Sequence, residues 1–253
     1  MPKHWLVAAA ASALTAVAST DAKAVELKLL SPPSLRTVMN EVVPQFENES
    51  GHKLAIVWEV MPVMKRQIEA GTTFDVAILP PDLMQDVIDA GKVGAATRTG
   101  FARTAIGVAV RKGTTRPDLS SVESTRRMLL DAKSIAYTSD GAVGNAFLAL
   151  LDRLGIAAQV RPKLKAMPGG TTVEPVARGE AELAITTIPG ILEVPGAELA
   201  GRLPSELQTY IVYTAGIGTA SQNSIAAAAF IKSLTTPAAV TVIKSKGLEQ
   251  VTP

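Results

Sequence analysis

The sequence predicts an α/β protein in which mostly parallel strands form a sheet flanked by helices. Apolar strand-like runs alternate with segments of helical period from Leu27 to Gly91, and glycine or proline marks most of their boundaries. The chain has 253 residues, of which 47% are hydrophobic, so it can bury a large core. Because strands separated by helices favour parallel pairing, we expect helices on both faces of the sheet.

Residues 1–24 precede this pattern and are typical of a cleaved secretory signal peptide. Lys3 lies near the start, an alanine-rich apolar run spans Trp5 to Ala18, and residues 22–24 form a small-x-small cleavage site. The apolar run is shorter than the roughly 20 residues that a membrane span needs. We therefore expect export to the periplasm, a mature chain that begins near Val25, and no stable membrane insertion.

The amino-acid composition excludes most kinds of catalytic site and metal site. The chain has no cysteine, and of its two histidines only His52 lies beyond the signal peptide. A catalytic triad would depend on that one histidine, and a zinc site of histidine and cysteine ligands cannot be built. The 25 basic and 23 acidic residues leave a charge of +2, too small for a nucleic-acid binder. We expect neither an enzyme nor a cofactor nor a nucleic-acid partner.

The first strand, Leu27–Leu30, leads into a turn in which Ser31 and Ser34 flank two prolines. Apolar residues then recur at steps of three and four up to Gly51, which predicts a helix. Pro44 removes one hydrogen bond, so we expect this helix to be bent or split. Ser34 is placed as its N-cap, where a hydroxyl beside free backbone N–H groups can hold an anion. The alternative is that Ser34 only caps its own helix.

Strand and helix signals continue to alternate after Gly51. Runs rich in β-branched and aromatic residues predict strands, glycines mark the ends of helices, and Pro81 suits the first turn of a helix. The predicted strands are Leu54–Val60, Phe74–Leu79 and Ala105–Val110, and the predicted helices are Val63–Ala70 and Pro81–Gly91.

The rest of the chain predicts a second unit of the same kind. Ser120 and Glu123 form a capping-box pair for a helix that ends near Ala132, and a helix carrying Phe147 follows the small residues 139–145. The further predicted strands are Ile135–Thr138, Lys163–Met167, Leu183–Thr187 and Glu206–Tyr213, and the further predicted helices begin after Thr172 and span Ser221–Leu234 and Pro237–Lys246.

Four turns place small or hydroxyl-bearing residues where predicted strands end or predicted helices begin. They are residues 31–34, 60–62, 138–145 and 169–172. In open parallel sheets, ligands bind outside the carboxyl ends of the strands. Each turn alone is ordinary turn chemistry, but together they predict a cleft that binds an anion with neutral donors.

Six stretches along the chain carry a family resemblance. They are VELKLLSPPSLRTV, FENESGHKLAIVW, KRQIEAGTTFDVAILPP, ARTAIGVAVRKG, PVARGEAELAITT and FIKSLTTPAAVTVIKSKG, and the most specific part is Arg66–Gly71 followed by Asp75. These stretches resemble the periplasmic molybdate-binding proteins of ABC importers. The resemblance implies a two-lobed periplasmic binding protein fold of type II, with two chain crossings. Lobe one would hold residues 25–103 and 218–253, and lobe two residues 104–217.

The resemblance also implies a function. The chain would be a monomeric receptor that holds molybdate or tungstate between its lobes through hydroxyl and backbone N–H groups, and that docks on the membrane subunits of an ABC importer. The only metal implied is the one within the oxyanion. The implied ligand contacts are Ser31, Ser34, Met61, Val143, Gly170, Thr171, Thr172 and Thr187, the last of which stands with Thr186 where the family often has a tyrosine.

The loop Val60–Val63 departs from the family, because it lacks the second serine. Methionine supplies no hydroxyl and proline no N–H group, so an oxyanion oxygen left unmatched there would cost about 1–3 kcal/mol. Met61 and Val63 would suit the apolar part of a small organic anion, although lobe packing also explains them. A receptor for such an anion, a receptor that serves a membrane sensor, and a less favoured periplasmic enzyme stay open as alternatives.

Overall fold

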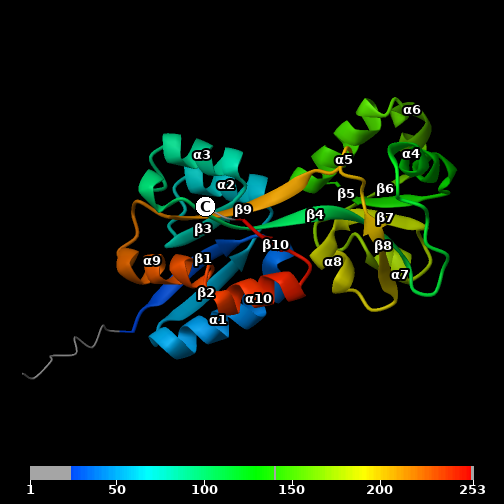
Figure 1. The fold of residues 1–253 in the computed structure, drawn as a ribbon. Coiled ribbons are helices and arrows are strands. Elements are labelled where there is room, and N and C mark those ends of the chain that lie inside the picture. Colours follow the sequence, from blue (N-terminus) through cyan, green and yellow to red (C-terminus); the bar gives the residue numbers. More distant parts are fainter. Residues whose placement is uncertain (1–23, 140, 252–253) are drawn as a thin grey trace, which may run out of the picture.

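The computed structural model describes residues 24–139 and 141–251. Figure 1 shows two lobes side by side, each with strands covered by helices, and β4 (Thr99–Arg111) and β9 (Tyr210–Ile217) at the junction between them. The predicted signal peptide lies outside the described residues, except for Ala24.

Lobe one is built on a sheet with the strand order β2-β1-β3-β9-β4. The strands β1 and β2 pair in parallel, as do β1 and β3, whereas β9 is antiparallel to both of its neighbours. The remaining elements of this lobe are β1 (Glu26–Ser31), β2 (Lys53–Trp58), β3 (Val76–Leu79), β10 (Glu249–Gln250), α1 (Arg36–Ser50), α2 (Met61–Glu69), α3 (Pro81–Asp89), α9 (Ser224–Ser233) and α10 (Pro237–Ser245).

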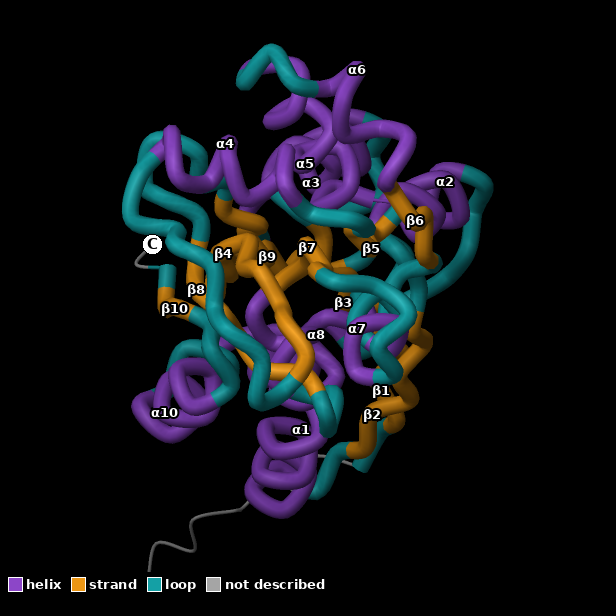
Figure 2. The backbone as a smooth tube through the Cα atoms, turned by 90° about the vertical axis from the view of Figure 1, so that its right-hand side faces the viewer, coloured by secondary structure: helices purple, strands orange, loops and turns teal. Residues whose placement is uncertain are grey.

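Lobe two continues from the second half of β4 in the order β4-β7-β5-β6, with β8 also paired to β4. Its elements are β5 (Ile135–Thr138), β6 (Leu164–Met167), β7 (Leu183–Thr187), β8 (Ala197–Arg202), α4 (Val122–Asp131), α5 (Gly141–Arg153), α6 (Ala157–Val160), α7 (Glu174–Ala177) and α8 (Ile188–Leu192). Figure 2 shows α4, α5 and α6 on one side of these strands and α7 and α8 on the other.

Each lobe buries its own apolar core. In lobe one, Phe46 of α1 meets Phe230 of α9 edge to face at 5.2 Å, so the C-terminal helices close over the first sheet. In lobe two, α4 and α5 pack on β4, β5 and β7 around Phe147 and Ile185. Val143 contacts both cores from the first turn of α5. A second, smaller apolar cluster in lobe two includes residues of α7 and α8. Because the clusters of lobe two are distinct from the core of lobe one, the lobes are separate packing units that meet along a seam.

Asp75 ties the C-terminal part of the chain to the first sheet. Its carboxylate accepts hydrogen bonds from the backbone N–H of Lys28 at 2.8 Å, from the hydroxyl of Ser221 at 2.6 Å and from the side chain of Asn223 at 3.3 Å. A buried carboxylate is stable when its oxygens are matched in this way. The strand motif that is most specific to the family resemblance is therefore structural at this position.

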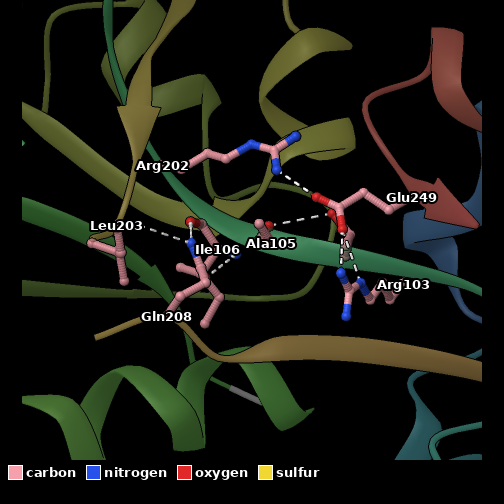
Figure 3. A network of polar contacts seen from close by, with 8 residues as sticks. Arg103, Ala105, Ile106, Arg202, Leu203, Gln208 and Glu249 are labelled. Carbon is pink, nitrogen blue, oxygen red and sulfur yellow. Dashed lines mark hydrogen bonds and ion pairs between the residues drawn. The ribbon is translucent and has the colours of Figure 1, made fainter. Parts of the chain in front are cut away.

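The chain changes lobes within β4. Residues 99–105 pair with β9 in the first sheet, and residues 106–109 pair with β7 in the second. At this junction the Gln208 side chain bonds to both backbone groups of Ile106, as a neighbouring strand would. Its Oε1 accepts from the N–H of Ile106 at 2.9 Å, and its Nε2 donates to the Ile106 carbonyl at 3.0 Å (Figure 3). The two crossing segments are thereby held together.

A charged group lies beside this crossing. Glu249 of β10 accepts from Arg103 of β4, with 2.9 Å between Oε2 and Nε, and from Arg202 of β8, with 2.5 Å between Oε1 and Nη1 (Figure 3). Hydrogen bonds from Arg202 and then Arg103 lower the pKa of Glu249 below its ordinary value. The guanidinium of Arg103 also stacks over the ring of Tyr210 at 4.2 Å.

The predicted α/β class and the two-lobed type II arrangement are confirmed. The division of the lobes at residues 103/104 and 217/218 stays a prediction. β9 pairs with β3 over its last four residues and with the first half of β4, so its buried side chains, Tyr213 among them, pack in the core of lobe one.

Several local predictions differ from the structure. The helix over Pro44 is a single element, so it is not split, and whether it is bent stays a prediction. The capping box uses Ser121 and Ser124, one residue later than expected, because Ser120 donates its N–H to Asp118 in the loop. The predicted strand Glu206–Tyr213 begins at Tyr210 instead. Elements α6, α8 and β8 are additions that the sequence pattern did not predict.

Within residues 24–139 and 141–251, no single helix is long and apolar enough to cross a membrane. By length and composition, α9 and α10 pass such a test together, as a pair bent by 59°.

Candidate anion-binding site between the lobes

A cavity of about 110 Å³ lies where the two lobes meet. Of the described residues that line it, Ser34 and Tyr213 belong to the first sheet and its turns, and the threonines belong to lobe two. The full lining is Pro32, Pro33, Ser34, Val60, Met61, Thr138, Gly141, Ala142, Val143, Gly169, Gly170, Thr172, Val173, Thr186, Thr187, Gly190, Glu193, Val194, Ile211 and Tyr213.

A larger groove, of about 640 Å³, lies at the far side of lobe two. Arginines and acidic side chains face it in equal number, and it is remote from the strand ends at the seam; its charged residues are Arg111, Arg116, Asp118, Arg127, Asp131 and Glu182. The smaller cavity is the better candidate because strand ends and helix starts from both lobes converge on it.

Three long helices begin at the cavity. The helix α1 is entered through a 3-10 turn, Pro33–Leu35, and α2 and α5 begin at Met61 and Gly141. No side chain caps the 3-10 turn or α2. The first N–H groups of a helix lack intrahelical partners, and the helix dipole favours negative charge beside them. The three helix starts therefore make this cavity suited to an anion.

Hydroxyl groups from both lobes surround the same space. In lobe two, the hydroxyl of Thr138 lies 2.8 Å from that of Thr172 and 3.4 Å from that of Thr186, and all three side chains are buried. Thr187 ends β7 beside them and is 4% exposed. Each hydroxyl can donate one hydrogen bond and accept others, so the cluster can turn its donors toward a ligand.

In lobe one, Tyr213 and Ser34 form a linked pair of hydroxyls. The O–H of Tyr213 donates to Oγ of Ser34 over 2.9 Å. Burial raises the pKa of Tyr213 to about 12, so the phenol stays protonated, and the hydrogen bond to Ser34 offsets this only in part. Because Ser34 accepts from Tyr213, its own hydrogen is left to donate, and the chain of two bonds strengthens that donor.

One wall of the cavity is apolar and carries no hydroxyl. Val60, Met61 and Val143 line it, and Met61 is 8% exposed. The expected lack of a hydroxyl in the loop Val60–Val63 therefore affects the cavity surface, because Val60 and Met61 line the cavity.

Glu193 is the one charged side chain among the described residues that line the cavity. It directly follows α8 at the rim of the cavity and is exposed to solvent. Partial burial raises the pKa of its carboxyl above the ordinary value, and hydrogen bonds from Thr37 and the positive charge of Arg36 oppose that rise. Both of the opposing groups belong to α1, so Glu193 faces lobe one across the seam.

Gly144 fixes where α5 begins relative to β5. A Cβ atom at this position would lie 2.0 Å from the carbonyl oxygen of Thr138, closer than any side chain tolerates. Glycine therefore allows the first turn of α5 to rest on the end of β5, which brings Val143 and Thr138 to the same cavity.

The structure brings together six of the eight predicted contact residues: Ser34, Met61, Val143, Gly170, Thr172 and Thr187 all line the cavity. Ser31 and Thr171 do not. Ser31 is fully buried at the end of β1, where its hydroxyl has no hydrogen-bond partner among the described residues, and the Thr171 side chain is exposed and donates to the Pro168 carbonyl at 3.0 Å. Whether the six residues bind a ligand stays a prediction.

Ser34 is not an N-cap, contrary to expectation. Pro32 occupies the cap of the 3-10 turn, and Ser34 lies inside that turn, because Pro33 fixes the first position. The Ser34 hydroxyl is therefore not used by its own helix and pairs with Tyr213 instead.

Tyr213 and Glu193 line the cavity but are not among the predicted contact residues. Tyr213 ended a predicted strand, which is the one signal that could have found it. Glu193 follows a helix that the sequence pattern did not predict, so it had no local signal. Among the described residues, no group of three or more acidic or histidine side chains is placed to hold a metal ion.

Comparison with known proteins agrees with this geometry. A family model described as bacterial extracellular solute-binding protein matches residues 27–249. An aconitate isomerase from a Pseudomonas species is 27% identical over 232 residues, which cover 89% of this chain and 88% of the relative. The molybdate-binding protein ModA of Escherichia coli (strain K12) is 25% identical over 256 residues, with 98% of each chain covered.

The fold is also that of solved binding proteins. The substrate-binding domain of a putative molybdenum ABC transporter from Clostridium difficile superposes with a TM-score of 0.73 at 17% identity, covering 90% of this chain and all of that domain.

Proposed function

The chain belongs to the family of bacterial extracellular solute-binding proteins, and we propose that it is a periplasmic receptor that binds a small anion between its lobes for an ABC importer. One observation carries the proposal: hydroxyl groups and three helix starts from both lobes meet at one cavity that no described lysine or arginine lines. Neutral donors and helix dipoles are sufficient to bind an anion.

The donor set explains how binding would close the lobes. Ser34 and Tyr213 approach the ligand from one side of the seam, and Thr138, Thr172 and Thr187 approach from the other. An anion that accepts from both groups bridges them, and each hydrogen bond to a charged group contributes about 1.5–3 kcal/mol. The closed arrangement is then favoured only when the ligand is present.

Molybdate or tungstate is the first candidate ligand. Support comes from the molybdate-binding relative in Escherichia coli and from the molybdenum transporter domain of Clostridium difficile. The hydroxyl-rich half of the cavity suits the oxygens of such an ion.

A small organic anion is the second candidate. The apolar wall of Val60, Met61 and Val143 suits hydrocarbon better than oxygen, and the relative from Pseudomonas is named for a tricarboxylic acid. We propose that the ligand leaves unchanged, because Glu193 is the one ionisable carboxyl among the described lining residues. Recovery of a bound organic acid as its isomer, measured by NMR, would instead establish an enzyme.

The remaining parts of the proposal follow from the same family membership. Residues 1–24 would direct export and be cleaved, the mature chain would act as a monomer, and its partners would be the membrane subunits of the importer. Copurification of those subunits with the ligand-loaded protein would distinguish an importer from a membrane sensor.

Thermal melting with calorimetry tests the proposal. The mature protein is titrated with molybdate, tungstate, sulfate, phosphate and small carboxylates. A ligand at 100 times its dissociation constant should stabilise the fold by about 2.7 kcal/mol. Replacing Ser34 by alanine should weaken that ligand by about one to two decades, because a donor is lost and the Tyr213 hydroxyl loses its acceptor.

The matched control is Ser205→Ala, which removes an exposed hydroxyl that bonds only to Glu206 among the described residues. This variant should bind as the wild type does. No thermal shift with any of these anions would refute the proposal, and equal effects of the two serine substitutions would refute the role of Ser34.

A further inference from the structure

The placement of Glu193 conflicts with a ligand that is negative on every side. An ionised carboxylate only accepts hydrogen bonds, and it repels other anions. Yet Glu193 lines the same cavity as the hydroxyl cluster and the helix starts. A ligand that fills this cavity therefore needs an anionic group at one end and a hydrogen-bond donor at the other.

The local surroundings leave this carboxylate available. Within the part of the chain that the structure describes, Glu193 forms no ion pair, and Arg36 lies instead over the ring of Trp58 at 4.6 Å. Thr37 of lobe one donates hydrogen bonds to the Glu193 carboxylate across the seam. A carboxylate has about four acceptor sites, so sites stay open for a ligand.

The helix α8 sets the distance between the two ends. Thr187 caps its start on the donor side, and Glu193 caps its end. At 1.5 Å per residue these positions are about 9 Å apart along the axis. A ligand that reaches both is longer than a single tetrahedral oxyanion, and the cavity that holds it is also lined by the apolar side chains of Met61 and Val143.

The helix α8 also packs against lobe one, which fixes the position of Glu193. Its apolar side contacts lobe one, where a Cβ on Gly247 would lie 2.7 Å from Cγ2 of Ile188 and 3.1 Å from Cδ1 of Leu192. Glu193 is thus presented from a helix packed against the end of α10 and is not carried on a free loop.

We propose that Glu193 is a specificity-determining residue that selects a small organic acid bearing a hydroxyl or ammonium group over oxyanions that have no donor. The inference rests on the proposed function, since it assumes that an anion occupies the cavity. The acid group of the ligand lies at the helix starts and hydroxyls, and its donor group bonds to Glu193.

Matched sets of ligands test this choice. Calorimetry compares butyrate, ω-hydroxybutyrate and ω-aminobutyrate, and then hexanoate, ω-hydroxyhexanoate and ω-aminohexanoate. The members of each set share a carbon skeleton and differ in the donor at the end opposite to the carboxylate. Molybdate and sulfate serve as donor-free oxyanions. In the wild type, at least one donor-bearing acid should bind about tenfold or more tightly than its donor-free counterpart and than either oxyanion. Hydroxy and amino acids are distinguished within the same series.

The substitution Glu193→Gln removes the charge and keeps the size. It should reduce the preference for the donor-bearing acid by about tenfold and should strengthen molybdate binding. Glu180→Gln, which changes an exposed carboxylate of lobe two that pairs with Arg178, is the control and should leave both affinities unchanged. Melting without ligand confirms that each variant is folded.

The outcomes separate the two proposals. Equal binding of donor-bearing and donor-free acids by the wild type, or an equal loss for every ligand in Glu193→Gln, overturns the role of Glu193 and leaves the anion receptor in place. Tighter binding of molybdate than of any donor-bearing acid also overturns it. Absence of binding by any anion overturns both.

Discussion

The cavity and the chain crossing both join the lobes, but they use opposite chemistry. The cavity presents neutral hydroxyls and helix starts with a single carboxylate at its rim. The crossing carries Glu249 between two arginines and an amide side chain on the backbone of Ile106. The cavity has room for a ligand, whereas the polar groups at the crossing are hydrogen-bonded to one another.

The difference bears on the proposed function. Under that proposal an anion would accept hydrogen bonds from both lobes at the cavity, so contact between the lobes there would depend on the ligand. At the crossing every partner is part of the chain, and the ion pairs are partly exposed, so each contributes only about 0–1 kcal/mol. Under the proposed function, the free energy that changes with ligand would therefore arise at the cavity and not at the crossing.

Gly144→Ala should have the largest effect on stability, because it displaces an element that lines the cavity. The added methyl would lie 2.0 Å from the Thr138 carbonyl oxygen, so α5 must move away from β5. Overpacking of this kind costs about 1–3 kcal/mol or more of unfolding free energy. The displaced helix start should also abolish the ligand-induced thermal shift. Both are measured by melting with and without the anion.

Gly100→Ala is the matched control for that experiment. Gly100 lies in the first half of β4, and among the described residues its new methyl would meet only Val251, at an ordinary 3.6 Å. Retention of the ligand shift in Gly144→Ala would show that α5 does not position the site.

Gln208→Ala should affect the crossing next most strongly. It leaves the buried N–H of Ile106 without its 2.9 Å acceptor, which costs about 1–3 kcal/mol of unfolding free energy. Urea unfolding measures this loss. Gln208 does not line the cavity, so the hydrogen-bond donors there are unchanged. The substitution should therefore lower the free energy of unfolding by more than it lowers the free energy of ligand binding.

The control for Gln208 is Gln222→Ala, since Gln222 is exposed and bonds to the nearby Ala220 carbonyl. If Gln208→Ala changed the free energy of ligand binding by more than the free energy of unfolding, the crossing and the binding site would not be independent.

Glu249→Gln should have the smallest effect, below about 1 kcal/mol, and the effect should shrink in salt. Because the pKa of Glu249 is lowered in the folded chain, its stabilisation is present above the ordinary value of 4.5 and is lost as pH falls through the lowered pKa. Wild type and variant should therefore differ at neutral pH and converge in acid. Melting across this pH range checks it, and a difference that grew in acid would contradict the assignment.

Local patterns predicted much of the candidate site. Ser34, Thr172 and Thr187 were selected because they stand at strand ends or helix starts, and all three line the cavity. Ser31 and Thr171 satisfied the same rule, yet the pleat of β1 buries the first and the turn before α7 directs the second to solvent. A one-residue difference within a turn decides which hydroxyl faces the cavity, and sequence spacing does not resolve it.

By itself, the sequence determined the alternation of strands and helices, the positions of the turns that reach the cavity and the lack of cysteine and histidine chemistry, because these depend on local periodicity and composition. Only the tertiary structure decided that β9 enters the first sheet antiparallel to β3, which brings Tyr213 to Ser34 across 179 positions of sequence. It also decided that α8 lies at the seam and presents Glu193 to the cavity. Such contacts form between elements distant in sequence, and no local pattern encodes them.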